Sequence, residues 1–302
     1  MRRMAWALPA VTLAVTACSV APAGTRPAAP RPASRPAASP VATPTAPATT
    51  EAPAAVAAAA TVPPRLPHSP HGGPGRFAPT APGVLDGKVV LVDPGHNGGN
   101  FDAPEIINQL IWNGRESETC DTTGAETDTG YTEAQFNWNV ARYLTADLRA
   151  AGATVVLTRT SNTGTGPCVT QRAALGNQAH ASAAVSIHAD GGPPGGRGFA
   201  ILEPVADGIN NAIIGPSARL GTDLRNAFAA GTGEPASTYD GINGIQPRDD
   251  LAGINLSTVP KVFIECANMR NPTDAALLTT PAWQAKAARA IAAGLTTFLT
   301  HR

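Results

Sequence analysis

The sequence predicts an α/β domain in which helices flank a mainly parallel central sheet. Short β-branched, apolar runs alternate along the chain with longer segments whose apolar residues recur at helical spacing. This alternation is confined to residues 83–302, because residues 19–82 carry almost no large apolar side chain. Alternating strands and helices are typical of parallel sheets. About 220 residues are enough for one well-buried domain, so we expect a single folded domain over residues 83–302.

The first expected strand covers residues 88–92 and stops at an Asp-Pro-Gly turn over residues 93–95. A long stretch rich in Gly, Asn and Thr follows over residues 97–130, and we then expect a helix over residues 131–151. Thr132 and Gln135 match a capping box at the start of this helix. Its apolar stripe has four-residue spacing, at Phe136, Val140, Leu144 and Leu148.

The remaining elements continue the alternation. Further strands are expected over residues 153–159, 183–188, 199–203 and 262–265, and further helices over residues 169–181, 212–229 and 281–300. In open α/β sheets, functional sites lie beyond the carboxyl ends of the strands. The chemistry of this chain is therefore expected at the strand ends.

The net charge of zero is the sum of two unlike parts. Residues 1–82 contain seven basic residues and one acid, a net of +6, together with 17 of the 29 prolines. Residues 83–302 carry a net charge of −6. An acidic folded domain argues against a nucleic-acid partner. No apolar run reaches the roughly 18 residues that a membrane-spanning helix needs.

Residues 1–18 are predicted to be an export signal. Arg2 and Arg3 precede a short apolar stretch, and the tetrapeptide VTAC ending at Cys18 resembles a bacterial lipobox. An ordinary cleaved secretion signal is the alternative. Residues 19–82 are predicted to be a disordered Pro/Ala-rich linker. We therefore expect an extracytoplasmic protein, either lipid-anchored at Cys18 to the outer face of the cell membrane or secreted into the cell wall or periplasm. Any membrane contact would be through that anchor.

Ionisable side chains stand at the ends of three expected strands. His96 follows the first strand, His188 ends the strand over 183–188, and Glu265 ends the strand over 262–265. Glu133 shares the inward-facing stripe of the first helix, where a carboxylate is costly unless it is paired or bound to a metal. Two His and one Glu match the ligands of catalytic zinc sites. Taken singly, each could instead be a hydrogen-bonded histidine or a solvated helix-start glutamate.

These residues lie in motifs that resemble the zinc-dependent N-acetylmuramoyl-L-alanine amidases with the type-3 catalytic domain. The motifs are, in chain order, residues 92–96 (VDPGH), Glu133, residues 186–190 (SIHAD) and residues 262–271. Residues 247–255 resemble the mycobacterial members in particular. The resemblance implies that His96, Glu133 and His188 bind one Zn²⁺ per chain and that Glu265 is the catalytic acid/base.

The resemblance also implies hydrolysis of the amide bond between N-acetylmuramic acid and L-alanine in peptidoglycan. Peptidoglycan or a muropeptide is then the expected partner, and we expect a monomer. Two alternatives stay open: a catalytically silent muropeptide-binding module on the same fold, and another zinc hydrolase such as a peptidase or deacetylase. Two departures from the family pattern, Asn97 after the first histidine and Ala267-Asn268 in place of Gly-Phe, leave the four functional positions intact.

Three cysteines remain beyond Cys18. Cys120 and Cys168 both fall in expected loops of an exported domain, which favours pairing them over pairing either with Cys266. The mycobacterial resemblance also implies a disulfide of this kind. Cys266 directly follows an apolar strand, so we expect a buried free thiol there, with a zinc-ligand role as the alternative.

Overall fold

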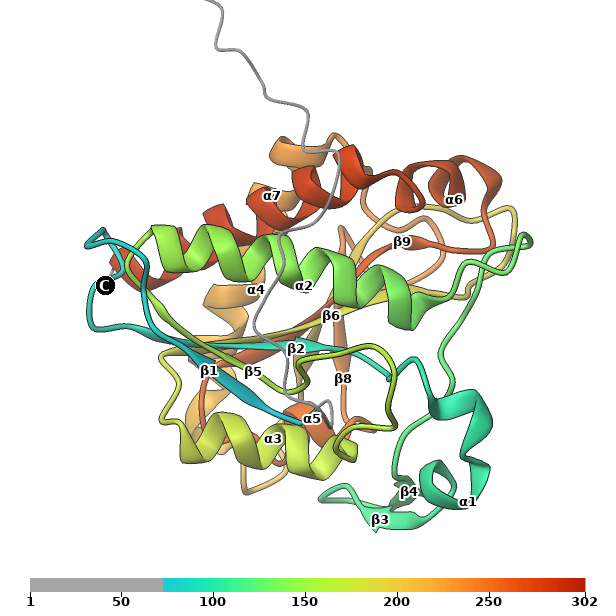
Figure 1. The fold of residues 1–302 in the computed structure, drawn as a ribbon, viewed down its shortest axis with the longest axis horizontal. Helices are drawn as coiled ribbons and strands as arrows, with labels where there is room; N and C mark the ends of the chain where they lie inside the picture. The colour runs from blue at the N-terminus through green and yellow to red at the C-terminus, as the bar shows by residue number, and fades with distance from the viewer. Residues whose placement is uncertain (1–72, 302) are drawn as a thin grey trace, which may run out of the picture. The chain divides into compact units, whose positions relative to one another are not determined.

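The structure, a computed structural model, describes residues 73–301, and these residues build a seven-stranded sheet with helices on both faces (Figure 1). Four of the six neighbouring strand pairs are parallel, so the expected α/β class is confirmed. In spatial order the strands are β1 (Gly75–Phe77), β5 (Thr154–Leu157), β2 (Val89–Pro94), β6 (Ala183–Asp190), β9 (Lys261–Asn268), β7 (Ala200–Pro204) and β8 (Ile245–Arg248).

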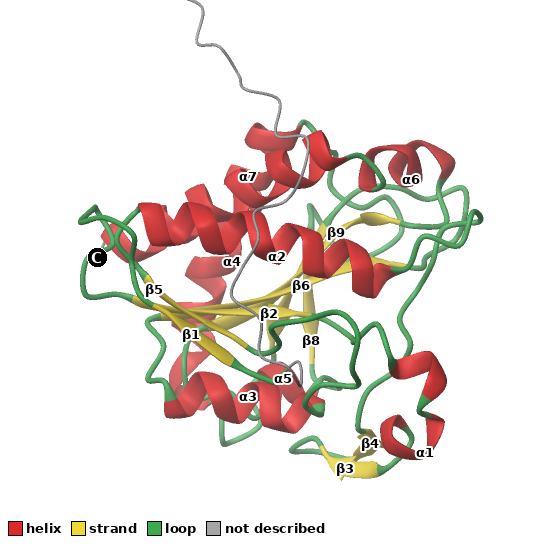
Figure 2. Ribbon diagram, in the orientation of Figure 1, coloured by secondary structure: helices red, strands yellow, loops and turns green. Residues whose placement is uncertain are grey.

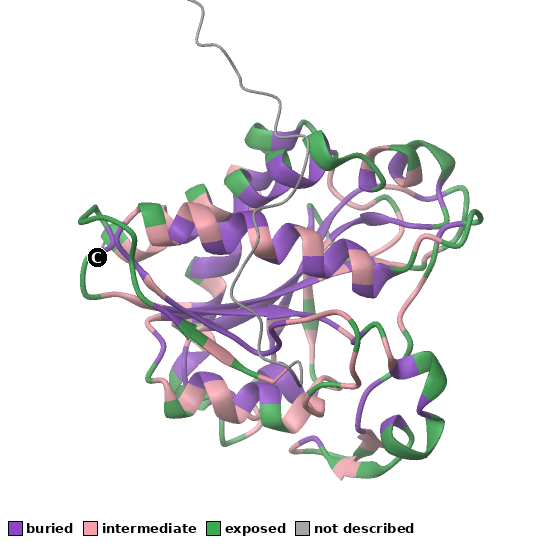
Figure 3. Ribbon diagram, in the orientation of Figure 1, coloured by how far each residue is buried: buried purple, intermediate pink, exposed green. Residues whose placement is uncertain are grey.

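Two helical layers cover the sheet (Figure 2). One face carries α2 (Glu133–Ala150), α4 (Ile214–Thr232) and α7 (Pro281–Thr300), and the other carries α3 (Val169–Gln178) and the short α5 (Ala252–Asn255). The largest hydrophobic cluster lies between the sheet and the first group of helices, and the central strands β2, β6 and β9 are buried along most of their length (Figure 3). Side chains alternate between the two faces along each strand. Val90 and Val92, for example, join this core, whereas Leu91 packs on the α3 side.

The helix expected over residues 131–151 is α2, which begins two residues later at Glu133. The Thr132 hydroxyl accepts a hydrogen bond from the Gln135 amide at 3.3 Å. The Gln135 side-chain oxygen accepts a hydrogen bond from Asn162 Nδ2 at 3.0 Å and none from the Thr132 amide, so only one half of the predicted capping box forms. The helix expected over 169–181 stops at Gln178, since His180 adopts a left-handed φ of 47°.

Short elements escaped the sequence analysis. Two are edge strands: β1, and β8, whose Pro247 opposes a strand assignment except at a sheet edge. Because β1 pairs with β5 and buries Phe77, the folded part begins before residue 83, and that expected boundary is wrong. The others are α1 (Pro104–Ile107), the hairpin β3 (Leu110–Trp112) and β4 (Ser117–Thr119), α5, α6 (Pro272–Leu278), and two 3-10 turns, η1 (Asn100–Asp102) and η2 (Asn211–Ile213).

The cysteines pair as expected. Cys120 and Cys168 form a disulfide with a Cα–Cα distance of 4.7 Å. It joins the residue that follows the β3–β4 hairpin to the residue that precedes α3. Cys266 is a buried free thiol on β9. It packs into the core beneath α2 and α7. The alternative role of Cys266 as a zinc ligand is therefore contradicted, because its neighbour Glu265 points to the opposite face.

The predicted export signal with Cys18 and the linker as far as residue 72 lie outside the described residues. Between residues 73 and 301, none of the helices combines the length and the apolar character that crossing a bilayer requires.

A half-buried carboxyl on β7 provides a test of the packing. An oxygen of Glu203 lies where a side chain at Gly221 of α4 would sit, and burial raises the pKa of Glu203 to about 7. The folded state therefore holds a proton that the unfolded chain loses near its ordinary pKa of 4.5. Stability should fall as the pH rises from about 4.5 to 7.

We therefore predict that Glu203→Gln raises the free energy of unfolding at pH 8 by about 1 kcal/mol, a value discounted for partial exposure, and leaves it nearly unchanged at pH 5. Urea melts at the two pH values measure this difference. The exposed Glu105 provides a control, and Glu105→Gln should not alter the pH dependence. Equal effects of Glu203→Gln at both pH values would contradict the assignment.

Candidate metal centre

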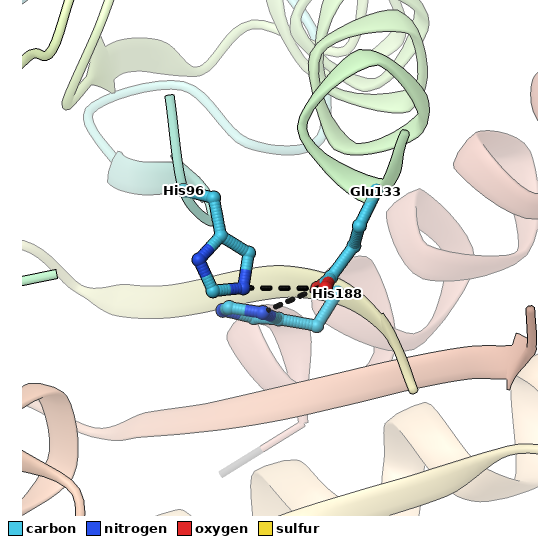
Figure 4. Close-up of side chains that lie close together, drawn as sticks. All are labelled: His96, Glu133 and His188. Carbon is cyan, nitrogen blue, oxygen red and sulfur yellow. Dashed lines mark hydrogen bonds and ion pairs between the residues drawn. The ribbon is translucent and has the colours of Figure 1, made fainter. Parts of the chain in front are cut away.

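The parallel strands bring the predicted residues to one edge of the sheet. His96 follows β2, His188 lies near the end of β6, and Glu265 is paired with His188 across β6 and β9. Glu133, the first residue of α2, reaches this edge from the helix layer (Figure 4). The structure thus gathers all four residues that the sequence analysis selected.

His96, Glu133 and His188 each offer one ligand atom, and these atoms lie within 4.8 Å of one another. Glu133 Oε2 is 3.3 Å from His96 Nε2, and Glu133 Oε1 is 2.9 Å from His188 Nδ1 (Figure 4). Glu133 is only 4% exposed, which confirms that it faces inward. Burial alone would raise its pKa, but His96 and His188 hold the pKa well below the ordinary value. Glu133 is therefore an ionised carboxylate between two imidazoles.

Hydrogen bonds behind the two rings determine which nitrogen of each faces Glu133. We assign the His96 proton to Nδ1, which lies 3.2 Å from Asp121 Oδ1 and 3.2 Å from the Thr122 carbonyl. His188 Nε2 lies 3.2 Å from the Ser186 hydroxyl, which itself donates to Asp93 Oδ2 at 3.0 Å. Ser186 can then only accept from His188, so that ring carries its proton on Nε2. His96 Nε2 and His188 Nδ1 are the nitrogens that face the Glu133 carboxylate, and these two would give up their protons and offer lone pairs when a cation is bound.

A buried ionic network connects the residues behind both rings. Arg172 of α3 reaches Asp93 Oδ1 at 2.9 Å and Asp121 Oδ2 at 3.5 Å, and Lys261 Nζ lies 2.9 Å from Asp93 Oδ2. Burial would raise the pKa of Asp93, but Lys261 and Arg172 hold it far below its ordinary value. Asn97 adds a hydrogen bond to Asp121 Oδ2 at 2.8 Å, so this departure from the family pattern helps to hold the site.

Glycines allow the close approach of the ligands. A Cβ at Gly95 would collide with the His188 ring. Gly124 has a φ of +75°, and a Cβ there would lie 2.8 Å from Glu133 Oε2. Both positions therefore require glycine, for space at Gly95 and for space and backbone conformation at Gly124.

Glu265 lies beside the three ligand residues on a cavity of about 320 Å³. Its Oε2 atom is buried and has no hydrogen-bond partner among residues 73–301. Burial, followed by the nearby carboxylates of Glu133 and Asp190, raises the pKa of Glu265 well above its ordinary value. This carboxyl group is free to exchange a proton with a molecule in the cavity.

The donor set fits a small divalent cation. Two imidazole nitrogens and one carboxylate are the protein ligands typical of catalytic zinc, and each imidazole is oriented by a second hydrogen bond, as metal-bound histidines usually are. Together with the orphaned oxygen of Glu265, the residues present are chemically suited to Zn²⁺ and to a reaction beside it.

Sequence comparison identifies the family. The family model described as N-acetylmuramoyl-L-alanine amidase matches residues 90–297, which span most of the folded part. The chain belongs to the N-acetylmuramoyl-L-alanine amidase family. The amidase shares 39% identity over 223 residues with an N-acetylmuramoyl-L-alanine amidase of Mycobacterium tuberculosis, covering 74% of this chain and 90% of that protein.

Solved structures agree with this assignment. An N-acetylmuramyl-L-alanine amidase of Mycobacterium smegmatis superimposes on this amidase with a TM-score of 0.68 and 42% identity, over 71% of this chain and 98% of that one. The apo form of the corresponding enzyme of Mycobacterium abscessus gives a TM-score of 0.67 and 38% identity, over 71% of this chain and 100% of that one. The predicted likeness to mycobacterial amidases is confirmed.

Four polar residues around the site were not selected from the sequence: Asp121, Ser186, Arg172 and Lys261. Ser186 stands two residues before His188, so it shares that strand face, and this spacing could have indicated it. Asp121 and Arg172 are brought together by tertiary structure alone, although the cysteine that precedes Asp121 marked its loop as anchored.

The arrangement predicts that Asp121→Asn weakens divalent-metal binding in this amidase. Loss of the carboxylate that orients His96 should raise the dissociation constant for zinc about 10- to 100-fold. Competition with a chromogenic chelator measures this constant. Asp102→Asn, which removes an exposed carboxylate from η1 in the chain between His96 and Asp121, should leave it unchanged. A zinc affinity of Asp121→Asn within twofold of the unaltered chain would refute the orienting role.

Proposed function

We propose that the chain hydrolyses the amide bond between N-acetylmuramic acid and L-alanine in peptidoglycan with one Zn²⁺ held by His96, Glu133 and His188. The observation that carries the proposal is the convergence of three ligand atoms beside the buried, unpartnered carboxyl oxygen of Glu265. Membership of the amidase family supports the choice of bond.

The side chains divide the reaction between them. Zinc held at the site would polarise the scissile carbonyl and make a neighbouring water more acidic. Glu265 accepts the proton of the attacking water through its free oxygen and then delivers it to the leaving amine of L-alanine. Asp121 and Ser186 keep the two imidazoles in fixed orientations throughout, because neither ring has to exchange its proton.

In this proposal, the segment before the folded part determines where the enzyme acts. The lipobox-like sequence at Cys18 would anchor the chain at the outer face of the membrane, and the Pro/Ala-rich linker would let the enzyme reach the wall. The enzyme would act as a monomer, since all four functional residues belong to one chain. A cleaved, secreted form would reach the same substrate.

Product analysis separates the candidate activities. Digestion of purified peptidoglycan by the zinc-loaded chain should release new L-alanine amino termini. Free acetate would indicate a deacetylase, new amino termini within the peptide a peptidase, and binding without any product the silent binding module. Each of these three outcomes would refute the proposed bond.

We predict that Glu265→Gln lowers turnover about 10²- to 10⁴-fold, because the acid/base is lost while the isosteric amide preserves the packing. Zinc content, measured by elemental analysis, should stay at one per chain. In the matched variant His188→Ala, bound zinc should fall along with activity. Normal hydrolysis by Glu265→Gln, or unchanged zinc in His188→Ala, would remove the respective residue from its role.

A further inference from the structure

The cavity at the candidate metal centre contains one permanently cationic side chain. Apart from the two histidines, its ionisable lining groups are the carboxylates of Glu133, Asp190 and Glu265, and the guanidinium of Arg248. Neither the catalytic step nor metal binding uses Arg248. A lone guanidinium in a cavity of carboxylates suggests a role in recognising an anion.

Strand register places Arg248 on the same sheet face as the catalytic carboxyl. Glu265 lies opposite Ala200 of β7, and Arg248 lies opposite Pro204 of the same strand, four residues further on. An even separation keeps both on one face. Neighbouring strands lie about 4.8 Å apart, so β9 and β8 are separated by about 10 Å across β7, and the four-residue offset adds about 13 Å along the strands. The two backbone positions are therefore about 16 Å apart, and the long side chain of Arg248 bridges part of this span, because both residues line one cavity.

The floor between the two charged groups is apolar. Leu202, Leu251 and Phe263 line the cavity together with Glu265 and Arg248. Leu202 belongs to β7, the strand between β9 and β8. An extended chain that starts beside Glu265 can therefore cross Leu202 and end at Arg248.

Asp250 holds the guanidinium in a defined orientation. Arg248 donates from Nε to Asp250 Oδ1 at 2.7 Å and from Nη2 to Asp250 Oδ2 at 2.6 Å. These bonds occupy the side edge of the guanidinium, whereas Nη1 has no hydrogen-bond partner among residues 73–301. The end edge, formed by Nη1 and the second proton of Nη2, remains available, and it matches a carboxylate in a two-point geometry.

We propose that Arg248 binds a carboxylate of the stem peptide, beyond the scissile amide. This inference rests on the proposed amidase function. Of the two halves of that substrate, the sugar side offers hydroxyl and acetamide groups, because its lactyl carboxyl is consumed in the scissile bond. A carboxylate is therefore available only on the peptide. Arg248 thus selects for free carboxylates over their amides.

A pair of synthetic substrates tests this selection. Both are N-acetylmuramoyl tripeptides that begin with L-alanine, and they differ only in whether the side carboxylates of the second and third residues are free or amidated. The unaltered chain should have a KM about 10-fold lower for the free acid, with a similar kcat, as expected for a partly exposed charge-assisted bond. Arg248→Gln should raise KM about 10-fold for the acid alone and thereby abolish the preference.

Two further variants keep the result interpretable. Arg115 makes a comparable ion pair with the adjacent Asp249, at 3.0 Å, but does not line the cavity. Arg115→Gln should leave both KM values unchanged. Arg248→Lys keeps the charge without the two-point edge and should restore part of the preference. Thermal melts establish that each variant is folded, and the substrate comparison on the unaltered chain does not depend on any variant.

The outcomes separate this inference from the proposed function. Cleavage of both substrates with equal KM by the unaltered chain overturns the carboxylate subsite and leaves the amidase activity in place. An equal rise in KM for both substrates in Arg248→Gln assigns Arg248 a structural role and also overturns it. If neither substrate releases L-alanine amino termini, the proposed function fails, and this inference fails with it.

Discussion

The buried ionic network of Asp93, Asp121, Arg172 and Lys261 is the constraint on which the rest of the site depends. Separating two cations and two carboxylates from water is costly unless each finds close, opposite partners. Here every member is paired, and two of them also lie behind the imidazoles. The carboxylates that neutralise the two buried cations are thus the same groups that orient the candidate ligands, directly for His96 and through Ser186 for His188.

Much of the fold could be predicted from the sequence because its signals are local. The β-branched run before His96 predicts a strand, and the apolar stripe that begins near Glu133 predicts a helix, each from neighbouring residues alone. Parallel topology then requires His96, His188 and Glu265 to meet at one edge, so the site followed from the order of elements. The short pieces escaped because three or four residues give no period, and Pro247 opposes the strand that it occupies at the edge.

The residues that support the candidate ligands were harder to predict from the sequence, for a physical reason. Asp121 lies 25 residues from His96, and Arg172 lies 51 residues from Asp121, with several helices, strands and loops between them. No periodicity connects such residues. Only the folded structure shows that the Cys120–Cys168 disulfide, Arg172 near the start of α3 and the Asn97 side-chain amide all hold the Asp121 carboxylate in place. Arg248 was visible as a member of a motif, but its role depends on which edge of the guanidinium Asp250 occupies.

Strand alternation has one further consequence, at Cys266. A thiolate is a strong zinc ligand, and this thiol is one residue away from the proposed catalytic carboxyl. The pleat sends it through the sheet into the hydrophobic core, where burial raises its pKa well above the ordinary value. The sheet therefore separates a soft, competing ligand from the face that carries the candidate metal centre. A one-residue slip of β9 would exchange the two groups, so the register of a single strand keeps the thiol away from the candidate ligands.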